Sequence, residues 1–295
     1  MSKLAITDEF LQEIELLQIL VKNNVAGMFG GNHKSKSYGS SCEFADLREY
    51  IPGDDITKID WNAYARFEKL YTKLYLDERR LHTRIYIDAS RSMEFGKAHK
   101  AEQALKIAAT LAYLSIGEMD KVSIYAIHGD QTEEIIENMS GKEAYLSNIG
   151  KLNEIEFTGD SRLSDAILPL SGVGYGDGLS VIISDFLTDS DYEAAIDYLA
   201  GKRRHVLCVQ VLSKEETNPK SRGKMHFFDS ENLTRAYRKN ITREIIQAYK
   251  KAVEYATGRI RDYCAARGAD YLLVSDEESA GEIFFGKLAN MEVVK

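Results

Sequence analysis

The sequence predicts an α/β protein with an open, mostly parallel sheet that carries helices on both faces, preceded by an N-terminal charged extension. Two observations support this fold class. From residue 83 onward, short apolar segments typical of strands alternate with segments of helical periodicity. In addition, residues 179–184 (LSVIIS) form a continuous apolar run, which is the pattern of a strand buried on both faces.

The N-terminal part predicts a helix, a loop and a charged segment. Thr7 is a suitable N-cap, and apolar residues follow it at helical spacing, namely Phe10, Ile14, Leu17 and Val21. Residues 30–41 are small, polar and rich in glycine, so they predict an exposed loop. The dense charges of residues 43–80 surround a turn signal at 52–55 (PGDD), and the alternating stretch 70–76 predicts a strand.

The remaining residues predict the sheet itself, so we expect two domains, 1–80 and 81–295. The expected strands are 83–87, 122–127, 133–137, 179–184, 205–212 and 271–274. The expected helices are 97–116, 141–151, 191–201 and 233–267. Because open α/β sheets bind ligands at the carboxyl ends of their strands, a functional site is expected at that edge.

The composition argues against several classes of protein. The chain has 295 residues, a formal net charge of −8 and three cysteines far apart in the sequence. The acidic balance disfavours a nucleic-acid-binding protein, and the cysteines fit neither a disulfide framework nor a zinc motif. No apolar run approaches the roughly 20 residues of a membrane-spanning helix, and acids interrupt the apolar N-terminal stretch, unlike a secretory signal. We therefore expect a cytoplasmic protein without a membrane span.

Side chains with oxygen donors follow the expected strands. Asp88, Ser90 and Ser92 form a D-x-S-x-S pattern directly after the first strand of the sheet. Ser161 precedes an expected short helix, and Asp185 follows the buried LSVIIS strand. Hard oxygen donors suit Mg²⁺ or Mn²⁺. Serine and aspartate are also common helix N-caps, so each residue alone has an ordinary structural explanation, and their combination predicts the metal site.

This combination resembles the metal-ion-dependent adhesion site of von Willebrand factor A domains. The resemblance implies that the three serine hydroxyls are direct ligands of the ion and that the two aspartates act mostly through bound water. Ser161 is a departure, because that family has threonine at this position and serine lacks the methyl group that restricts the rotamer. The neighbouring Asp160 is an alternative carboxylate.

The charged segment carries motifs that occur together in one family. The sequence has a GDD motif at 53–55, an IDW motif at 59–61 and an ISDF motif at 183–186. The order of these three motifs resembles that of the bacterial domain-of-unknown-function family number 58. In that family a charged segment of this kind precedes a von Willebrand A-like sheet. The resemblance covers the chain from about residue 30. It implies a von Willebrand A-like fold for the sheet and a role as an adaptor for a MoxR-type AAA+ ATPase.

The charged residues of this segment have two interpretations. Acid–base or metal chemistry would use residue types that are present at His33, Asp54, Asp55 and Asp60. Alternatively, arginines pair with the acids and lock the proline turn against the sheet, with an apolar anchor from tryptophan. We favour this second interpretation, a structural clasp formed by Arg48, Asp54, Asp55, Asp60 and Trp61, with Arg66 and Arg84 as further partners.

These observations together predict a non-enzymatic, metal-dependent protein-interaction module. Its ion would offer an open coordination position to a carboxylate of a protein partner, and the resemblance implies that this partner is a MoxR-type AAA+ ATPase. The alternative is a Mg²⁺-dependent hydrolase that uses the same loop. A hydrolase usually needs a general base or nucleophile beside the metal, for which Lys97 and His99 are the nearest candidates in the sequence.

Overall fold

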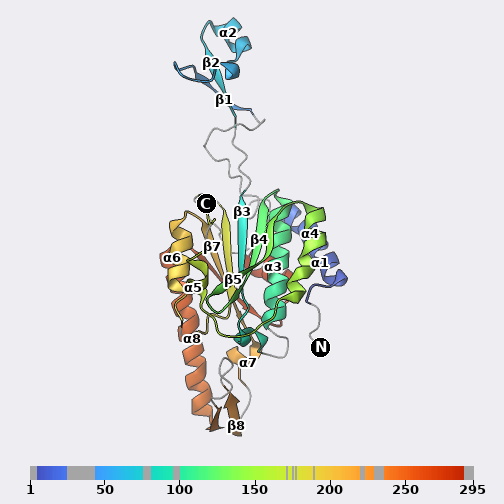
Figure 1. Cartoon of the computed structure of the whole chain (residues 1–295), viewed down its shortest axis with the longest axis vertical. Coiled ribbons are helices and arrows are strands. Elements are labelled where there is room, and N and C mark those ends of the chain that lie inside the picture. Colours follow the sequence, from blue (N-terminus) through green and yellow to red (C-terminus); the bar gives the residue numbers. More distant parts are fainter. Residues whose placement is uncertain are drawn as a thin grey trace. The chain divides into compact units, whose positions relative to one another are not determined.

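The computed structural model describes residues 5–24, 44–75, 81–95, 100–170, 172–174, 176, 178–188, 190–219, 223–228 and 236–288. They belong to two compact units (Figure 1). The sheet unit comprises Met1–Val25 and Leu81–Lys295, and the small unit comprises Ala26–Arg80. His33, Lys97 and His99 lie outside the described residues, as does the glycine-rich stretch 30–41.

Six strands form the sheet, in the order β10-β7-β6-β3-β4-β5. Neighbouring strands are parallel except for β4 and β5, which are antiparallel. The strands are β3 (His82–Asp88), β4 (Lys121–His128), β5 (Gln131–Met139), β6 (Leu179–Ser184), β7 (His205–Leu212) and β10 (Asp270–Ser275). The expected mostly parallel α/β sheet is therefore confirmed, with all six expected strands present.

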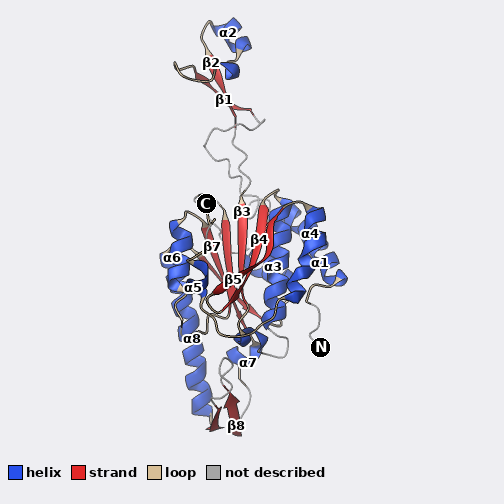
Figure 2. Cartoon of the chain, viewed as in Figure 1, coloured by secondary structure: helices blue, strands red, loops and turns tan. Residues whose placement is uncertain are grey.

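Helices cover both faces of this sheet (Figure 2). Helix α3 packs on one face and contacts α1 and α4, while α5, α6 and α8 pack against the other face. The helices are α1 (Asp8–Asn24), α3 (Lys100–Gly117), α4 (Lys142–Asn148), α5 (Leu163–Ile167), α6 (Glu193–Gly201), α7 (Lys214–Thr217) and α8 (Arg243–Ala266). Short turns of helix lie at η2 (Arg91–Glu94), η3 (Ile149–Glu154) and η4 (Glu282–Lys287). None of the described helices is both long and apolar enough to cross a lipid bilayer.

Helix α1 belongs with the sheet, which corrects the expected division into residues 1–80 and 81–295. Its apolar residues Phe10 and Ile14 are buried, and the ammonium of Lys106 on α3 lies 5.9 Å from the centre of the Phe10 ring. The side chain of Asn153 accepts a hydrogen bond from the backbone N–H of Ile6 and donates one to its carbonyl, both at 3.0 Å. The helix thus buries its apolar face on α3, far from it in the sequence.

The C-terminal helix is shorter than expected. The periodicity predicts a helix over 233–267, but Ala236–Ile241 forms strand β9, which pairs with β8 (Gly223–Phe228) as an antiparallel hairpin. Thr242 then caps α8, because its side chain accepts a hydrogen bond from the backbone N–H of Ile245 at 3.4 Å. Residues 236–241 therefore pair across the hairpin instead of beginning the helix.

The small unit combines two strands with one helix. Strand β1 (Phe44–Glu49) pairs antiparallel with β2 (Tyr71–Tyr75), and between them lie η1 (Ile56–Lys58) and α2 (Trp61–Phe67). Strand β2 confirms the alternating stretch in the sequence, whereas β1 and α2 were not expected.

A buried arginine ties three strands of the sheet together. Arg204, directly before β7, donates to the hydroxyl of Ser180 at 2.6 Å and to the carbonyls of Leu179, at 2.7 Å, and His82. Gly178 leaves room for this guanidinium, since a Cβ there would lie 2.8 Å from the His82 carbonyl oxygen and 2.9 Å from Arg204 Nη1. Its φ of +155° is also a backbone conformation that favours glycine.

We expect Gly178→Ala to lower the free energy of unfolding of the sheet unit by at least about 2 kcal/mol, because the added methyl group collides with backbone and guanidinium atoms. Gly150→Ala is the matched control, since a Cβ at Gly150 meets no atom within 4 Å. Urea unfolding measures both changes. Equal stability of the two variants would mean that the region around Arg204 rearranges at no cost.

Candidate metal centre

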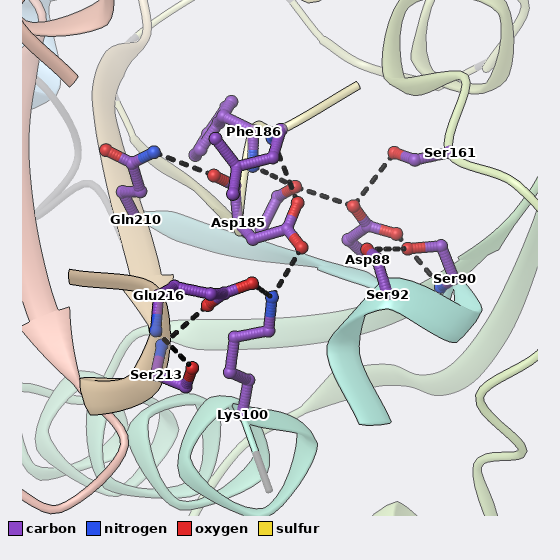
Figure 3. Close-up of polar contacts among 12 residues, drawn as sticks. Asp88, Ser90, Ser92, Lys100, Ser161, Asp185, Phe186, Gln210, Ser213 and Glu216 are labelled. Carbon is purple, nitrogen blue, oxygen red and sulfur yellow. Dashed lines mark hydrogen bonds and ion pairs between the residues drawn. The ribbon is translucent and has the colours of Figure 1, made fainter. Parts of the chain in front are cut away.

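The five metal-site residues predicted from the sequence meet at the carboxyl ends of β3 and β6 (Figure 3). Asp88 is the last residue of β3, Ser90 and Ser92 lie in the turn that follows, and Asp185 comes directly after β6. Ser161 reaches the same place from the loop before α5. The parallel strands therefore bring together side chains from three separate loops.

The Asp88 carboxylate is the centre of a hydrogen-bond network. Its Oδ1 accepts a hydrogen bond from the backbone N–H of Ser90 at 2.9 Å, and its Oδ2 accepts from the hydroxyls of Ser161 at 2.8 Å and Ser184 at 2.6 Å. Asp88 is fully buried. Burial, and secondly the charge of Asp185, raise the pKa of Asp88, against the hydrogen bonds of Ser184 and Ser90 that lower it. A buried carboxylate whose described partners are all neutral donors is stabilised by a cation.

The serine hydroxyls surround this carboxylate. The Oγ atoms of Ser90 and Ser92 lie 3.1 Å apart; Ser90 is buried and Ser92 is partly exposed. The loop after β6 fixes Ser161, since the hydroxyls of Thr188 and Ser190 donate to its carbonyl at 3.0 and 2.6 Å. The loop after β6 thus holds Ser161 in place, while the side chain of Ser92 lies toward solvent.

Asp185 differs from Asp88 because a basic side chain contacts it. Its Oδ2 accepts a hydrogen bond from the ammonium of Lys100 at 2.7 Å, and its Oδ1 accepts from the backbone N–H of Leu187 at 3.0 Å. The Lys100 ammonium also lies 2.8 Å from Oε1 of Glu216. Burial alone would lower the pKa of Lys100, but the charges of Asp185 and Glu216 outweigh burial and the pKa is raised.

An unusual backbone conformation orients Asp185. The next residue, Phe186, has a φ of +52°, which is rare for a bulky side chain. Its backbone N–H donates to the hydroxyl of Ser184 at 2.9 Å, and its ring packs edge-on against Tyr192 with centroids 5.5 Å apart. The side chain of Gln210 donates to the Asp185 carbonyl at 2.7 Å. Contacts on both sides of Asp185 therefore fix its position.

Lys100 and Glu216 were missing from the sequence-based site. A signal for Lys100 exists, since it stands four residues before Ala104 on the apolar stripe of α3, where lysine is unusual. Glu216 ends an S-x-x-E pattern that starts at Ser213, and the structure shows a capping box there. Neither signal identifies the partners of these side chains.

The donor set fits a hard divalent ion. Hydroxyl and carboxylate oxygens are the ligands that Mg²⁺ and Mn²⁺ prefer. Within the described ranges, no group of three or more His, Cys, Asp or Glu side chains could hold a metal ion. The candidate metal centre is therefore defined by the hydroxyl and carboxylate oxygens of the D-x-S-x-S loop and its neighbours.

The family of the chain follows from its sequence. Residues 46–258 match the family model described as "Protein of unknown function DUF58". The chain belongs to the DUF58 family. It is 26% identical over 223 residues to uncharacterised proteins of Mycobacterium tuberculosis and Mycobacterium bovis, and this match covers 74% of the chain and 70% of each relative.

Solved structures similar to this DUF58 protein include the conserved hypothetical protein BatB from Bacteroides thetaiotaomicron. That match has a TM-score of 0.43 and 18% identity, and it covers 71% of this chain and 98% of BatB. Another is the von Willebrand A domain of SpRpn10, with a TM-score of 0.40 and 9% identity over 74% of this chain and all of that domain.

Four residues of the expected clasp make local contacts within the small unit of this DUF58 protein. Arg48 pairs with Asp54 at 2.7 Å. Asp55 caps η1, and Asp60 caps α2 and lies 3.6 Å from the ammonium of Lys73. The three acids are therefore held mainly by local turns and helix ends.

Two further residues of the expected clasp make contacts within their own units. Trp61 meets the Tyr64 ring edge-on at 6.3 Å in the small unit. Arg84 belongs to the sheet unit and donates to the carbonyl of Gly172 there. A clasp between the small unit and the sheet stays a prediction.

We expect the small unit to be sensitive to acid. Hydrogen bonds lower the pKa values of Asp54, Asp55 and Asp60 below 3.8, chiefly from the Ile51 N–H, the Thr57 side chain and the Ala63 N–H, respectively. The stability that each contributes is complete above the unfolded pKa and is lost as the pH falls through the folded pKa. Hydrogen exchange of the β1–β2 amides should therefore accelerate as the pH drops below about 4, after correction for the intrinsic rate.

Asp60→Asn is the control for this expectation, because asparagine is an equally good N-cap that does not titrate. This variant should show a weaker dependence on pH. If the unmodified protein and Asp60→Asn show the same acid sensitivity, titration of the Asp60 carboxyl group does not cause it.

Proposed function

We propose that this protein is a non-enzymatic, metal-dependent protein-interaction module whose partner is a MoxR-type AAA+ ATPase. The observation that carries the proposal is the buried Asp88 carboxylate, which accepts hydrogen bonds from neutral groups next to three serine hydroxyls. Ser90, Ser92 and Ser161 would hold Mg²⁺ or Mn²⁺, with Asp88 and Asp185 as nearby carboxylates. A bound ion would supply an exchangeable coordination position for a carboxylate of the partner.

The surroundings of the site support an interaction with another protein. Phe95, at the end of turn η2, is 50% exposed, and Leu187, two residues after Asp185, is 37% exposed. Apolar side chains next to a polar centre are typical of protein interfaces, where they add buried area to a specific contact. A single carboxylate–metal contact is small, so these neighbours would contribute part of the affinity.

The chemistry of the described site favours binding over hydrolysis. Lys100 is the basic side chain in this network, but its raised pKa keeps it protonated, so it is a poor general base. The acids of the small unit, Asp54 and Asp55, are engaged as partner of Arg48 and as helix cap. We therefore expect the purified protein to show no ATPase, phosphatase or nuclease turnover with Mg²⁺.

The proposed partner follows from the family resemblance and is tested directly. The full-length protein is immobilised, and binding of the MoxR-type ATPase from the same organism is measured with Mg²⁺ and with a chelator. We expect the ATPase to bind with an affinity in the micromolar range that falls at least tenfold with chelator. The double variant Ser90→Ala, Ser92→Ala should show the same loss of affinity in Mg²⁺. Ser147→Ala is the control, since its hydroxyl bonds only its own helix, at the Glu143 carbonyl.

Two results would overturn the proposal. A complex that keeps its affinity in chelator and in the double serine variant would place binding outside this centre. Turnover that copurifies with the protein and disappears in Asp88→Asn would identify a hydrolase that uses the same loop.

A further inference from the structure

Lys100 is a fully buried ammonium at the edge of the metal centre. Its Nζ lies 2.7 Å from Asp185 Oδ2 and 2.8 Å from Glu216 Oε1, and its side chain is 0% exposed. Figure 3 shows the side chain of Lys100 directed at these two carboxylates, with Asp185 between it and Asp88. One cation is therefore already present beside the loop that would hold another.

The two aspartates of the centre differ in how their charge is balanced. Asp88 accepts hydrogen bonds from neutral groups, whereas Asp185 shares the ammonium of Lys100 and uses its second oxygen for the Leu187 N–H. A carboxylate that is paired with an ammonium attracts a second cation less strongly. The ammonium itself also repels a divalent ion, and both effects are large where water is excluded.

The position of Lys100 is fixed from the opposite side as well. Glu216 contacts Lys100 with Oε1 and accepts a hydrogen bond from the backbone N–H of Ser213 with Oε2, at 2.7 Å. The Ser213 hydroxyl in turn accepts from the Glu216 N–H at 3.1 Å. This capping box keeps Glu216, and with it the ammonium, at the start of α7. Because Glu216 holds the ammonium from the other side, moving Lys100 away from Asp185 would break both buried ion pairs.

We propose that Lys100 is a built-in cation that competes with the divalent ion for Asp185 and so sets the metal affinity of this centre. The inference deepens the proposed function and rests on the same site. It assigns Lys100 as an affinity-determining residue that does not itself hold the metal. With Lys100 present, the ion depends mainly on Asp88 and the serine hydroxyls, and Asp185 becomes fully available only when the ammonium is removed.

The test is a calorimetric titration of the full-length protein with Mn²⁺ alone. We expect Lys100→Gln to bind Mn²⁺ at least tenfold more tightly than the unmodified protein, because the charge is lost while the glutamine amide can still donate hydrogen bonds. Adding Asp185→Asn should cancel this gain, and Asp185→Asn should cost more affinity in the Lys100→Gln protein than in the unmodified one. Lys106→Gln, on the same helix but paired with Glu102, is the matched control and should change nothing.

Each outcome decides between the inference and the proposed function. Unchanged or weaker Mn²⁺ binding by Lys100→Gln overturns the inference, and the proposed function survives if the unmodified protein binds. Binding by Lys100→Gln alone supports the inference and removes the metal from the proposed function. Binding by neither protein overturns both.

Glu216→Gln tests the inference without removing Lys100. The variant leaves the ammonium with Asp185 as its one charged partner, so we expect at least threefold weaker Mn²⁺ binding. Glu215→Gln, at a neighbouring position of α7, is its control. Tighter binding by Glu216→Gln would overturn the inference even if Lys100→Gln failed to fold.

Discussion

Asp88→Asn should weaken Mn²⁺ binding by at least about 100-fold, equivalent to about 2.7 kcal/mol, while the sheet unit stays folded. The carboxylate of Asp88 is the one in the centre that is not paired with an ammonium, so its charge contributes most to attracting the ion. Asparagine keeps the size of the side chain. The hydroxyls of Ser161 and Ser184 can rotate to accept from its amide group, so the loop need not rearrange.

Binding and stability are measured separately for this variant. Calorimetry with Mn²⁺ gives the affinity, and urea unfolding in chelator gives the stability, which we expect to fall by no more than about 1 kcal/mol because a buried charge is removed while the asparagine amide still has hydrogen-bond partners in Ser161 and Ser184. Asp197→Asn is the matched control: its carboxylate is 49% exposed and pairs with Arg267 at 2.8 Å. Equal Mn²⁺ affinities of the two variants would exclude Asp88 from the metal site.

Lys100→Met should cost the sheet unit about 3–5 kcal/mol of unfolding free energy in chelator. Methionine removes the ammonium and leaves the carboxylates of Asp185 and Glu216 without a cation in a site that is almost closed to water. The control is Lys106→Met, which breaks a partly exposed pair with Glu102 and should cost less than about 1 kcal/mol.

A rescue experiment separates charge from packing in this result. Adding Asp185→Asn and Glu216→Gln to Lys100→Met replaces both unpaired carboxylates with neutral amides, and most of the lost stability should return. If the triple variant is as unstable as Lys100→Met, the loss comes from packing of the aliphatic chain, and the ion pairs contribute little.

The sequence predicts the sheet well for a physical reason. Strands buried on both faces appear as continuous apolar runs, so residues 179–184 matched β6 (Leu179–Ser184) and residues 205–212 matched β7 (His205–Leu212). Strand β9 gave no such signal, because its stability comes from pairing with β8 across the hairpin. The contact between Trp61 and Tyr64 was not predicted either, because the sequence of a charged block does not indicate which ring a tryptophan meets.

The juxtaposition of the candidate metal-site residues was predictable where they adjoin strand ends. Asp88 ends the buried strand β3 and Asp185 directly follows the buried strand β6, and the parallel topology brings them to one edge. Lys100 was not predictable as a member of the site, because its two acidic partners lie 85 and 116 residues further along the chain. Long-range ion pairs have no local pattern, so the unusual position of Lys100 on the apolar stripe does not identify its acidic partners.

The attachment of helix α1 to the sheet unit has a consequence for synthesis of the chain on the ribosome. The helix ends at Asn24, whereas its docking surface begins with α3 at Lys100 and includes Asn153. At about 5–20 residues per second, several seconds pass before that surface is made. During this interval Phe10 and Ile14 have no folded surface to cover them, so the nascent chain presents an amphipathic helix with an uncovered apolar face to chaperones at least until Asn153 emerges.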